Sequence, residues 1–427
     1  MNSPYVKLRP EQEQAVIQYL QICKSGSLFE IPKHINNPKI SVIIPMFNEE
    51  KNITLLLRSI QNQTFKDIEI VCVDDNSTDY TLYILKTYQK EDSRIKIVHN
   101  KKNRGVLYSR VFGALHSKGE YVLFADADDA FCHVKAFENI YKEMQEKKVD
   151  IIHFQSCGGL YKGGFGFDTP CLFFTFCPFT LNKIFKQPEL RDNYLARKRN
   201  ITGSAYIFDK LYSRKCIEKI ANSIGEPFWQ QHLIFVDDFL FAFTAMRVAE
   251  SFCMINEMAY WHWIENSDSV TSNFFGIDGF NLKNPEKTNK KILDYILIKE
   301  KMFQMVENDP NACELMLGIV RDMEKEGYYD ILPRSVHFER FVNIYKKFMN
   351  WKYCTKDARK KALEGVKKFI KKKIDVQYKY MELFTYDVQD SWIVEKNTKV
   401  FEETRLKFIE ENKKNKEVKK YEFTDVE

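Results

Sequence analysis

Between residues 40 and 154, short runs of β-branched residues alternate with stretches of helical periodicity. The runs at residues 40–44, 68–73, 95–98, 121–125 and 149–154 are expected to be strands. The first stretch between them places Ile53, Leu56, Leu57 and Ile60 at the spacing of one buried helix face. This alternation is typical of a parallel sheet with crossover helices, so the sequence predicts an α/β fold. We expect Pro45 to end the first strand, because proline donates no ladder hydrogen bond.

Three of these strands are followed by side chains suited to binding a ligand. They are Phe47-Asn48-Glu49 after the first strand, Asp74-Asp75 after the second and residues 126–129 after the fourth. In an open parallel sheet the ligand lies beyond the carboxyl ends of the strands, so one crevice could collect all three groups. The alternative is that aspartate and asparagine stand here only as turn and cap residues. Their occurrence at three equivalent positions favours a ligand site.

The segments 41–49 (SVIIPMFNE), 73–79 (VDDNSTD) and 126–129 (DADD) together resemble the family 2 glycosyltransferases of the GT-A fold. The resemblance is specific over residues 39–154 and looser as far as residue 272. It implies a Rossmann-like, mostly parallel sheet flanked by helices, with a mainly helical C-terminal region. It also implies an enzyme that takes a sugar from a nucleotide-sugar donor. The Q-x-x-R-W pattern of processive membrane synthases does not occur, so we expect one sugar to be added at a time.

The length of 427 residues favours more than one domain. We expect a helical N-terminal extension at residues 1–38, a GT-A domain at 39–275 and a helical, lysine-rich region at 276–427. By the resemblance, residues 39–154 form the nucleotide-binding half and residues 155–275 the acceptor half. The glycine-rich stretch 155–180 predicts a loop that faces the substrate. Further strands are expected at 205–208 and 258–263, and a segment that closes over the donor at 265–271.

The nucleoside pocket implied by the resemblance consists of Pro45, Phe47, Asn48 and Glu49, with Asp75 accepting a hydrogen bond from the uracil ring. The physical chemistry agrees, because an aromatic face stacks on a base and a carboxylate selects a ring N–H. The expected donor is therefore a UDP-sugar.

The diphosphate of such a donor needs positive charge, and no glycine-rich phosphate loop follows the first strand. By the resemblance, Asp126-Ala127-Asp128 is a D-x-D motif that holds Mn²⁺ or Mg²⁺ against both phosphates. Asp128 is the chief metal ligand, and Asp126 contacts the metal, a metal-bound water or the ribose. Arg104 and Arg110 could reach the diphosphate, or either could be a solvated charge.

His262 stands at a position where some GT-A enzymes place a third metal ligand. The alternative is a packed side chain between two tryptophans. For Asp129 the alternatives are a share in the site and a helix cap.

A base is also required, because an acceptor hydroxyl attacks poorly until its proton leaves. The pair Asp237-Asp238 resembles the acidic pair that begins a helix in this family, with Asp238 as the base and Asp237 in a supporting role. The alternative is that Asp237 caps the helix while Asp238 complements its dipole. One base and no enzyme nucleophile predict inversion at the anomeric carbon.

The net charge of +6 is too small to indicate nucleic-acid binding. Basic residues concentrate between residues 352 and 373 in an amphipathic pattern, which predicts either a helix packed on the protein or peripheral contact with an anionic membrane. No stretch has the length and apolarity of a membrane span or the pattern of a secretory signal, and the 10 cysteines show no paired spacing. We therefore expect a cytoplasmic protein. The expected acceptor is a glycan or a lipid-linked sugar. The alternatives are an inactive nucleotide-sugar-binding protein and a sugar-1-phosphate nucleotidyltransferase.

Overall fold

The computed structural model describes residues 5–7, 9–26, 31, 37–159, 173–176, 181–195, 206–235, 237–263, 285–325 and 336–372. The chain divides into two compact units, Met1–Ile298 and Lys299–Glu427. The division falls within α11 (Pro285–Val306). The segment expected to close over the donor, 265–271, lies outside the described residues. So do residues 160–172 and 177–180 of the predicted glycine-rich loop 155–180.

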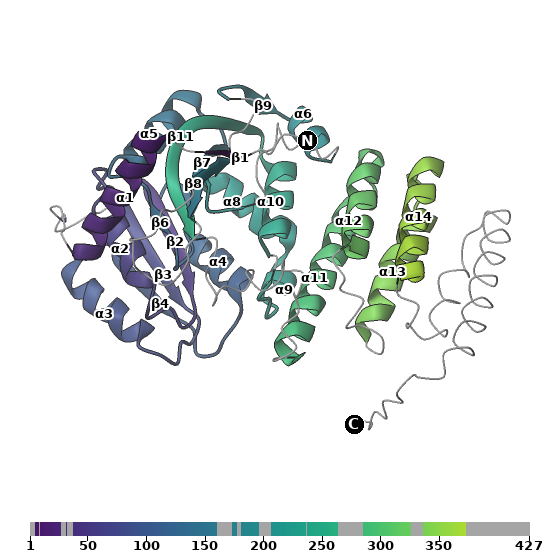
Figure 1. Ribbon diagram of the computed structural model, residues 1–427, viewed down its shortest axis with the longest axis horizontal. Helices are drawn as coiled ribbons and strands as arrows, with labels where there is room; N and C mark the ends of the chain where they lie inside the picture. Colours follow the sequence, from purple (N-terminus) through teal and green to yellow (C-terminus); the bar gives the residue numbers. More distant parts are fainter. Residues whose placement is uncertain are drawn as a thin grey trace. The chain divides into compact units, whose positions relative to one another are not determined.

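The first unit contains a mixed sheet with the strand order β1-β8-β7-β10-β5-β2-β3-β4 (Figure 1). Its parallel part is β5 (Tyr121–Phe124), β2 (Ile40–Met46), β3 (Ile68–Asp74) and β4 (Ile95–His99). The antiparallel part is β10 (Lys210–Ser213), β7 (Ile151–Gly159), β8 (Phe173–Phe176) and β1 (Tyr5–Lys7). The long strand β11 (Ser251–Trp263) runs parallel to β7 and also pairs with β6 (Ala130–Phe131) and β9 (Ile184–Lys186).

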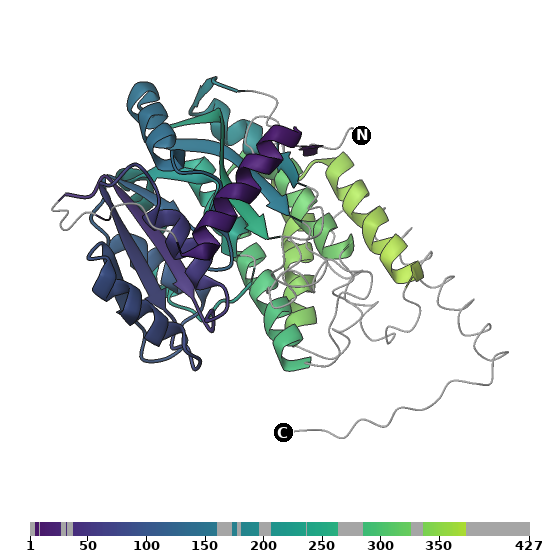
Figure 2. The ribbon, with the colours of Figure 1, turned by 60° about the vertical axis from the view of Figure 1, so that its left-hand side comes forward.

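Helices cover both faces of this sheet. In Figure 1, α2 (Ile53–Gln61) and α3 (Thr81–Glu91) lie on one side of the parallel strands, and α4 (Val106–Leu115) and α8 (Arg214–Ile224) lie on the other. The helix α5 (Ala136–Lys147) shares the core of α2. The N-terminal helix α1 (Pro10–Ser25) packs on α2 and crosses in front of the sheet in Figure 2. The remaining helices of this unit are α6 (Glu189–Leu195), α9 (Glu226–Trp229) and α10 (Asp237–Val248).

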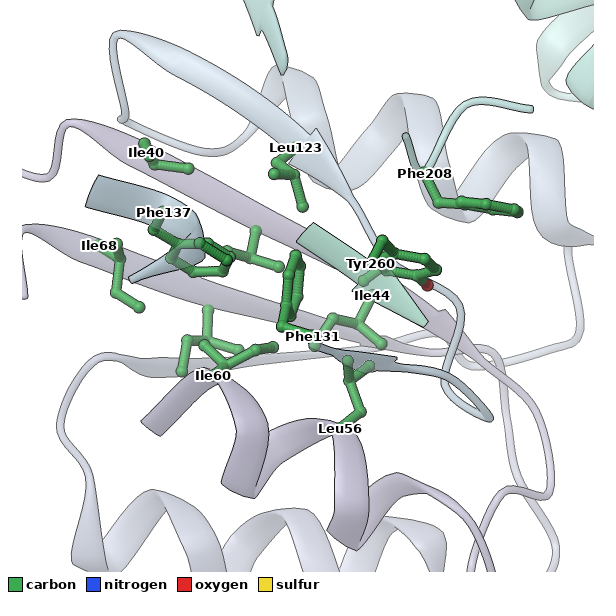
Figure 3. Close-up of a cluster of buried hydrophobic side chains, with 14 of the residues drawn as sticks. Ile40, Ile44, Leu56, Ile60, Ile68, Leu123, Phe131, Phe137, Phe208 and Tyr260 are labelled. Atoms are coloured by element: carbon green, nitrogen blue, oxygen red, sulfur yellow. The ribbon is translucent and has the colours of Figure 1, made fainter. Parts of the chain in front are cut away.

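The main core forms where the predicted apolar face of α2 meets the strands. Figure 3 shows Leu56 and Ile60 of this helix pointing toward the sheet, with the rings of Phe131 and Tyr260 nearby. These two rings meet edge to face with centroids 5.3 Å apart. Burial of the four residues of the predicted i, i+3, i+4, i+7 stripe confirms the helix expected from its periodicity. The core fixes the carboxyl ends of β2, β3 and β5, from which the candidate site projects.

The expectation that Pro45 ends the first strand is wrong, because β2 continues through Met46. Pro45 stays in register with Val73 of β3, while the ladder to β5 ends at Ile43. The Ile43 carbonyl accepts a hydrogen bond from the Ala125 N–H, so the backbone polar groups of Ile43 point toward β5. Backbone directions alternate along a strand, so those of Pro45, two residues later, point the same way. The missing N–H therefore points where no ladder continues, and a proline is tolerated.

Two other expected elements differ from the structure. The strand expected at residues 205–208 is found at Lys210–Ser213, because β10 pairs there with both β5 and β7. The stretch 155–180 is not loop throughout: β7 continues to Gly159, and β8 begins at Phe173. Pairing with β8 and β11 supplies the hydrogen bonds that extend β7 through its glycines.

The second unit is helical in the part that the structure describes. It contains η1 (Pro310–Ala312), α12 (Cys313–Lys325), α13 (Val336–Asn350) and α14 (Lys356–Lys372). The apolar stripe predicted on α14 is buried at Ala358 and Ala362, and this helix packs against α12. None of the described helices is long and apolar enough to span a membrane. Contact of residues 352–373 with an anionic membrane stays a prediction.

Candidate active site

The loops after β2 and β3 are joined by hydrogen bonds at the carboxyl edge of the sheet. Asn48 has a φ of 60°, a left-handed conformation that asparagine tolerates better than most residues. Its backbone N–H donates to the Ser77 hydroxyl (3.0 Å), and its side-chain oxygen accepts from the N–H of Thr78 (2.8 Å). Phe47 remains 45% exposed beside this junction, so its ring offers a face to a ligand. The two loops predicted to form the nucleoside pocket are therefore adjacent.

Asp75 is buried at the end of β3 and faces the start of α4. One carboxylate oxygen accepts from the Asn100 side chain and from the Arg104 backbone N–H, and the other accepts from the Gly105 N–H, each at 2.8 Å. Gly105 has a φ of +87°, and a side chain there would collide with the backbone of Leu233, so this close approach requires glycine. The acceptor capacity left on Asp75 is limited to the lone pairs that these three donors do not use.

Arg104 lies at the edge of the same pocket. Its guanidinium carbon stands 4.4 Å from the centroid of the Tyr108 ring, and Nη2 donates to the Gln230 side chain at 3.5 Å. The side chain is therefore oriented along α4 and toward α9, and its predicted contact with the diphosphate stays a prediction.

Glu49 connects the nucleoside side with the D-x-D segment. The pKa of the Glu49 carboxyl is raised to about 7, chiefly by burial and also by the nearby charges of Asp126, Asp79 and Asp129, while a hydrogen bond from Asn52 opposes the shift. The interaction shows that the carboxylates after β2 and β5 share one region. The predicted convergence of strand ends is present in the structure.

The D-x-D segment is fixed to β11 through Tyr260. The backbone N–H of Asp126 donates to the Tyr260 hydroxyl (2.9 Å), which in turn donates to the Asp129 carboxylate (2.8 Å). Asp129 is fully buried and is followed by β6, so it does not cap a helix. Asp128, the last residue of the D-x-D motif, is partly exposed. The loop is thus held by a buried phenol and a buried carboxylate.

His262 also contacts Asp129. Its Nδ1 lies 3.1 Å from each oxygen of that carboxylate, and its ring stacks on Phe208 with centroids 5.0 Å apart. Burial alone would lower the pKa of His262, but the charge of Asp129, with those of Asp128 and Asp126, raises it to about 9. The histidine is therefore both packed and placed beside the D-x-D carboxylates.

The acidic pair begins α10 as predicted, and Arg110 of α4 connects it to the D-x-D segment. Nη1 of Arg110 donates to Asp237 (2.6 Å) and to Asp238, and Nη2 donates to Asp126 (2.6 Å). The Arg110 side chain is only 5% exposed. It is therefore not a solvated charge, and its predicted contact with the diphosphate stays a prediction.

Burial raises the pKa of the Asp238 carboxyl to about 7. The Arg110 charge lowers this pKa, Asp237 and Asp126 raise it, and Lys210 lowers it. Lys210 is fully buried in β10, where it donates to Asp209 (2.6 Å) and to the Tyr206 carbonyl (2.5 Å). The environment of Asp238 is that of a carboxylate tuned toward neutral pH, as a general base requires.

Comparison with known proteins identifies the domain that carries this site. Residues 41–197 match the family described as glycosyl transferase family 2. Over these residues the chain is similar to the family 2 glycosyltransferases. The glycosyltransferase class that the sequence predicts is the class of the matched family. The matched residues include the nucleoside loops and the D-x-D segment, whereas Asp238 and His262 lie beyond them.

Two relatives of the family 2 domain are bacterial. An uncharacterized glycosyltransferase of Bacillus subtilis, EpsJ, is 30% identical over 236 residues, which cover 55% of this chain and 63% of the relative. The GalNAc(5)-diNAcBac-PP-undecaprenol beta-1,3-glucosyltransferase of Campylobacter jejuni is 43% identical over 93 residues, 22% of this chain and 30% of the relative. The chain thus spans less than two thirds of the length of each of these relatives.

A solved structure shares the fold. The crystal structure of S. aureus TarS 1-349 in complex with UDP-GlcNAc has a TM-score of 0.53 and 19% sequence identity, and the match covers 80% of this chain and 93% of that chain. The mixed, mostly parallel sheet flanked by helices and this similarity confirm the predicted α/β fold of the GT-A class.

Proposed function

We propose that this chain is an inverting, metal-dependent glycosyltransferase that transfers one sugar from a UDP-sugar to a hydroxyl of a glycan or lipid-linked acceptor. One observation carries the proposal: Arg110 binds Asp126 of the D-x-D segment and the pair Asp237-Asp238 at the same time. A residue expected to hold the donor's leaving group and the residue expected to take the acceptor's proton therefore meet around one buried guanidinium.

The donor is supported by the nucleoside side of the site. Phe47 offers a ring face, and Asp75 after β3 keeps the carboxylate lone pairs that its three protein donors leave unused, a combination that suits a uracil base. The S. aureus neighbour was crystallised with UDP-GlcNAc and shares the fold. A UDP-sugar is the donor that these features favour, with Pro45, Asn48 and Glu49 completing the pocket.

The residues present fit a divalent cation of the hard type. Asp126 and Asp128 would supply carboxylate oxygens, and His262 an imidazole nitrogen, a donor set that Mn²⁺ accepts and that Mg²⁺ accepts in its oxygen part. No three histidine, cysteine or acidic side chains among the described residues form a ready-made metal site. Few protein ligands are expected for a cation shared with a diphosphate. When bound, the cation would stabilise the negative charge on the leaving diphosphate.

The proton transfer falls to Asp238. Its carboxylate takes the proton of the acceptor hydroxyl as the oxygen attacks the anomeric carbon, and the bond from that carbon to the phosphate oxygen breaks. Attack opposite the leaving group inverts the anomeric configuration, so an α-linked donor gives a β-linked product. The name of the Campylobacter jejuni relative specifies a β-linkage and an undecaprenol-linked acceptor, which supports inversion and a lipid-linked acceptor here.

A panel of nucleotide sugars tests the proposal. Purified protein is incubated with UDP-GlcNAc, UDP-glucose, UDP-galactose or GDP-mannose, with MnCl₂ or with EDTA, and release of the free nucleotide is measured. We expect turnover of at least one UDP-sugar with the metal and none with EDTA. Tight nucleotide binding without turnover would instead indicate a binding protein that has lost catalysis, and full activity in EDTA would exclude the metal.

A further inference from the structure

Arg110 forms ion pairs with carboxylates from two parts of the chain that are far apart in sequence. Asp126 follows β5, whereas Asp237 and Asp238 begin α10. Within the described part of the chain, each hydrogen bond that this guanidinium donates goes to one of these three carboxylates. A guanidinium is a planar, rigid fork, so binding two groups at once fixes their directions as well as their charges.

The arrangement matters most for Asp238, which is partly buried beside other negative charges. Burial and the charges of Asp237 and Asp126 disfavour its ionised form, whereas Arg110 and Lys210 favour it. Lys210 acts on Asp238 through its charge, and its hydrogen bonds to Asp209 and to the Tyr206 carbonyl hold its ammonium group in β10. Arg110, by contrast, donates a hydrogen bond directly to the Asp238 carboxylate.

Resting on the function proposed above, we propose that Arg110 is the positioning residue of the base: it holds the Asp238 carboxylate beside the D-x-D segment and does not bind the donor. Both terminal nitrogens of Arg110 already donate to carboxylates, and the side chain is buried. Its contribution is therefore to orient the Asp238 carboxylate toward the acceptor hydroxyl. The diphosphate must then be neutralised by other groups.

The test is a double-mutant cycle between Arg110→Met and Asp238→Asn, measured as nucleotide release from the UDP-sugar of the panel above that turns over fastest. Arg110→Met should lower kcat by about 10²-fold, the size of effect expected when a catalytic group is misplaced. The KM for the donor and the Kd for UDP, measured by calorimetry, should change by less than about threefold, since the backbone of Asp126 is still held by the Tyr260 hydroxyl. In the Asp238→Asn background, Arg110→Met should cause almost no further loss, because the two residues act as one unit.

A pH profile separates positioning from a general loss of structure. The groups that face Asp238 are Arg110 from α4, Asp126 from the loop after β5, Lys210 from β10 and Asp237 from its own helix. Removing the guanidinium removes a charge that favours ionised Asp238, so the acid limb of kcat/KM should move to higher pH in Arg110→Met. Arg110→Lys retains the charge without the fork, so its acid limb should stay near that of the unaltered protein while kcat falls.

A matched control is Arg94→Met, which breaks a buried ion pair with Asp92 (2.8 Å) just before β4, at the opposite edge of the sheet. It should lower the melting temperature and leave kcat unchanged. If Arg110→Met does not fold, as judged by circular dichroism, Arg110→Lys and its double variant with Asp238→Asn complete the same cycle.

Several results would overturn the inference. A tenfold or larger loss of UDP affinity in Arg110→Met would make Arg110 a donor-binding residue, and fully additive losses in the cycle would show that it acts independently of Asp238. These results differ from failure of the proposed function itself. If Asp238→Asn retains full activity, the assigned base is wrong, and if no nucleotide sugar turns over, the proposed function and this inference both fail.

Discussion

His262 and Asp129 form an ion pair in which Nδ1 of the imidazole lies 3.1 Å from both carboxylate oxygens. The same carboxylate accepts from the Tyr260 hydroxyl, which holds the backbone of Asp126. One buried side chain therefore orients the histidine and the D-x-D segment together. A histidine that donates one ring N–H to a carboxylate presents its other nitrogen in a fixed direction, as metal-binding histidines do.

Asp129→Asn should weaken Mn²⁺ binding in the presence of UDP by about 10–100-fold, because the second partner of a metal-ligating histidine contributes on this scale. The free Mn²⁺ signal in electron paramagnetic resonance measures the affinity directly. Asp150→Asn, at the opposite edge of the sheet next to β7, is the control and should bind Mn²⁺ normally. Unchanged affinity in Asp129→Asn would remove His262 from the proposed ligand set.

A pair of buried tyrosines offers a stability prediction with its own control. Tyr260 and Tyr212 are both fully buried, but the Tyr260 hydroxyl has two partners, whereas the Tyr212 hydroxyl has none among the described residues. Tyr260→Phe leaves the backbone N–H of Asp126 without its partner and removes one of the donors to the Asp129 carboxylate, so it should lower the free energy of unfolding by about 1–3 kcal/mol. Tyr212→Phe removes a group without a partner and should be neutral or stabilising in the same denaturant titration. Equal effects of the two changes would contradict the network.

Asp238→Asn keeps the size of the side chain but cannot take a proton, so turnover should fall by a factor of about 10² to 10⁴ with donor affinity nearly unchanged. Asp237→Asn should lose less activity, because Asp237 is assigned a supporting role beside the same guanidinium. Both variants are compared in the nucleotide-release assay, and the product's anomeric configuration is read by NMR. Equal losses, or a product that retains the configuration, would identify the wrong carboxylate or the wrong mechanism.

Local patterns predicted much of this molecule. The apolar stripe of α2 and the strand runs from β2 to β5 depend on periodicity within short segments, and the acidic pair at the start of α10 was expected from the resemblance of residues 235–240 to the family. The convergence of strand ends follows from the geometry of a parallel sheet. These features required no knowledge of long-range packing.

The partners of single side chains could not be predicted in this way. Arg110 was compatible with a solvated charge or a phosphate contact, and only the fold brings two carboxylates from α10 and the Asp126 carboxylate from the loop after β5 to it. The sequence around Asp129 was compatible with a helix cap. In the structure β11 pairs with β6, and this pairing brings Tyr260 and His262 into contact with the Asp129 carboxylate. Pro45 is tolerated in β2 because the neighbouring ladder stops first. Each depends on an element distant in sequence.

The raised pKa of Asp238 gives two pH dependences of opposite sense. Burial, opposed by Arg110 and reinforced by Asp237 and Asp126, raises the pKa of this carboxyl to about 7. A base must be ionised, so kcat/KM should rise as the pH increases through about 7.

Stability should change the other way. Because the unfolded carboxyl titrates near pH 3.9, the folded protein binds more protons than the unfolded chain between about pH 4 and pH 7, and the free energy of unfolding falls as pH rises through that window. Asparagine does not titrate. The melting temperature of Asp238→Asn relative to that of the unaltered protein should therefore increase between pH 5 and pH 8, as measured by calorimetry in matched buffers. Comparing the two proteins cancels the contributions of Glu49 and His262, whose pKa values are also raised. Melting curves that run parallel across this range would show that Asp238 is already ionised at pH 5, and the acid limb of kcat/KM would then belong to another group.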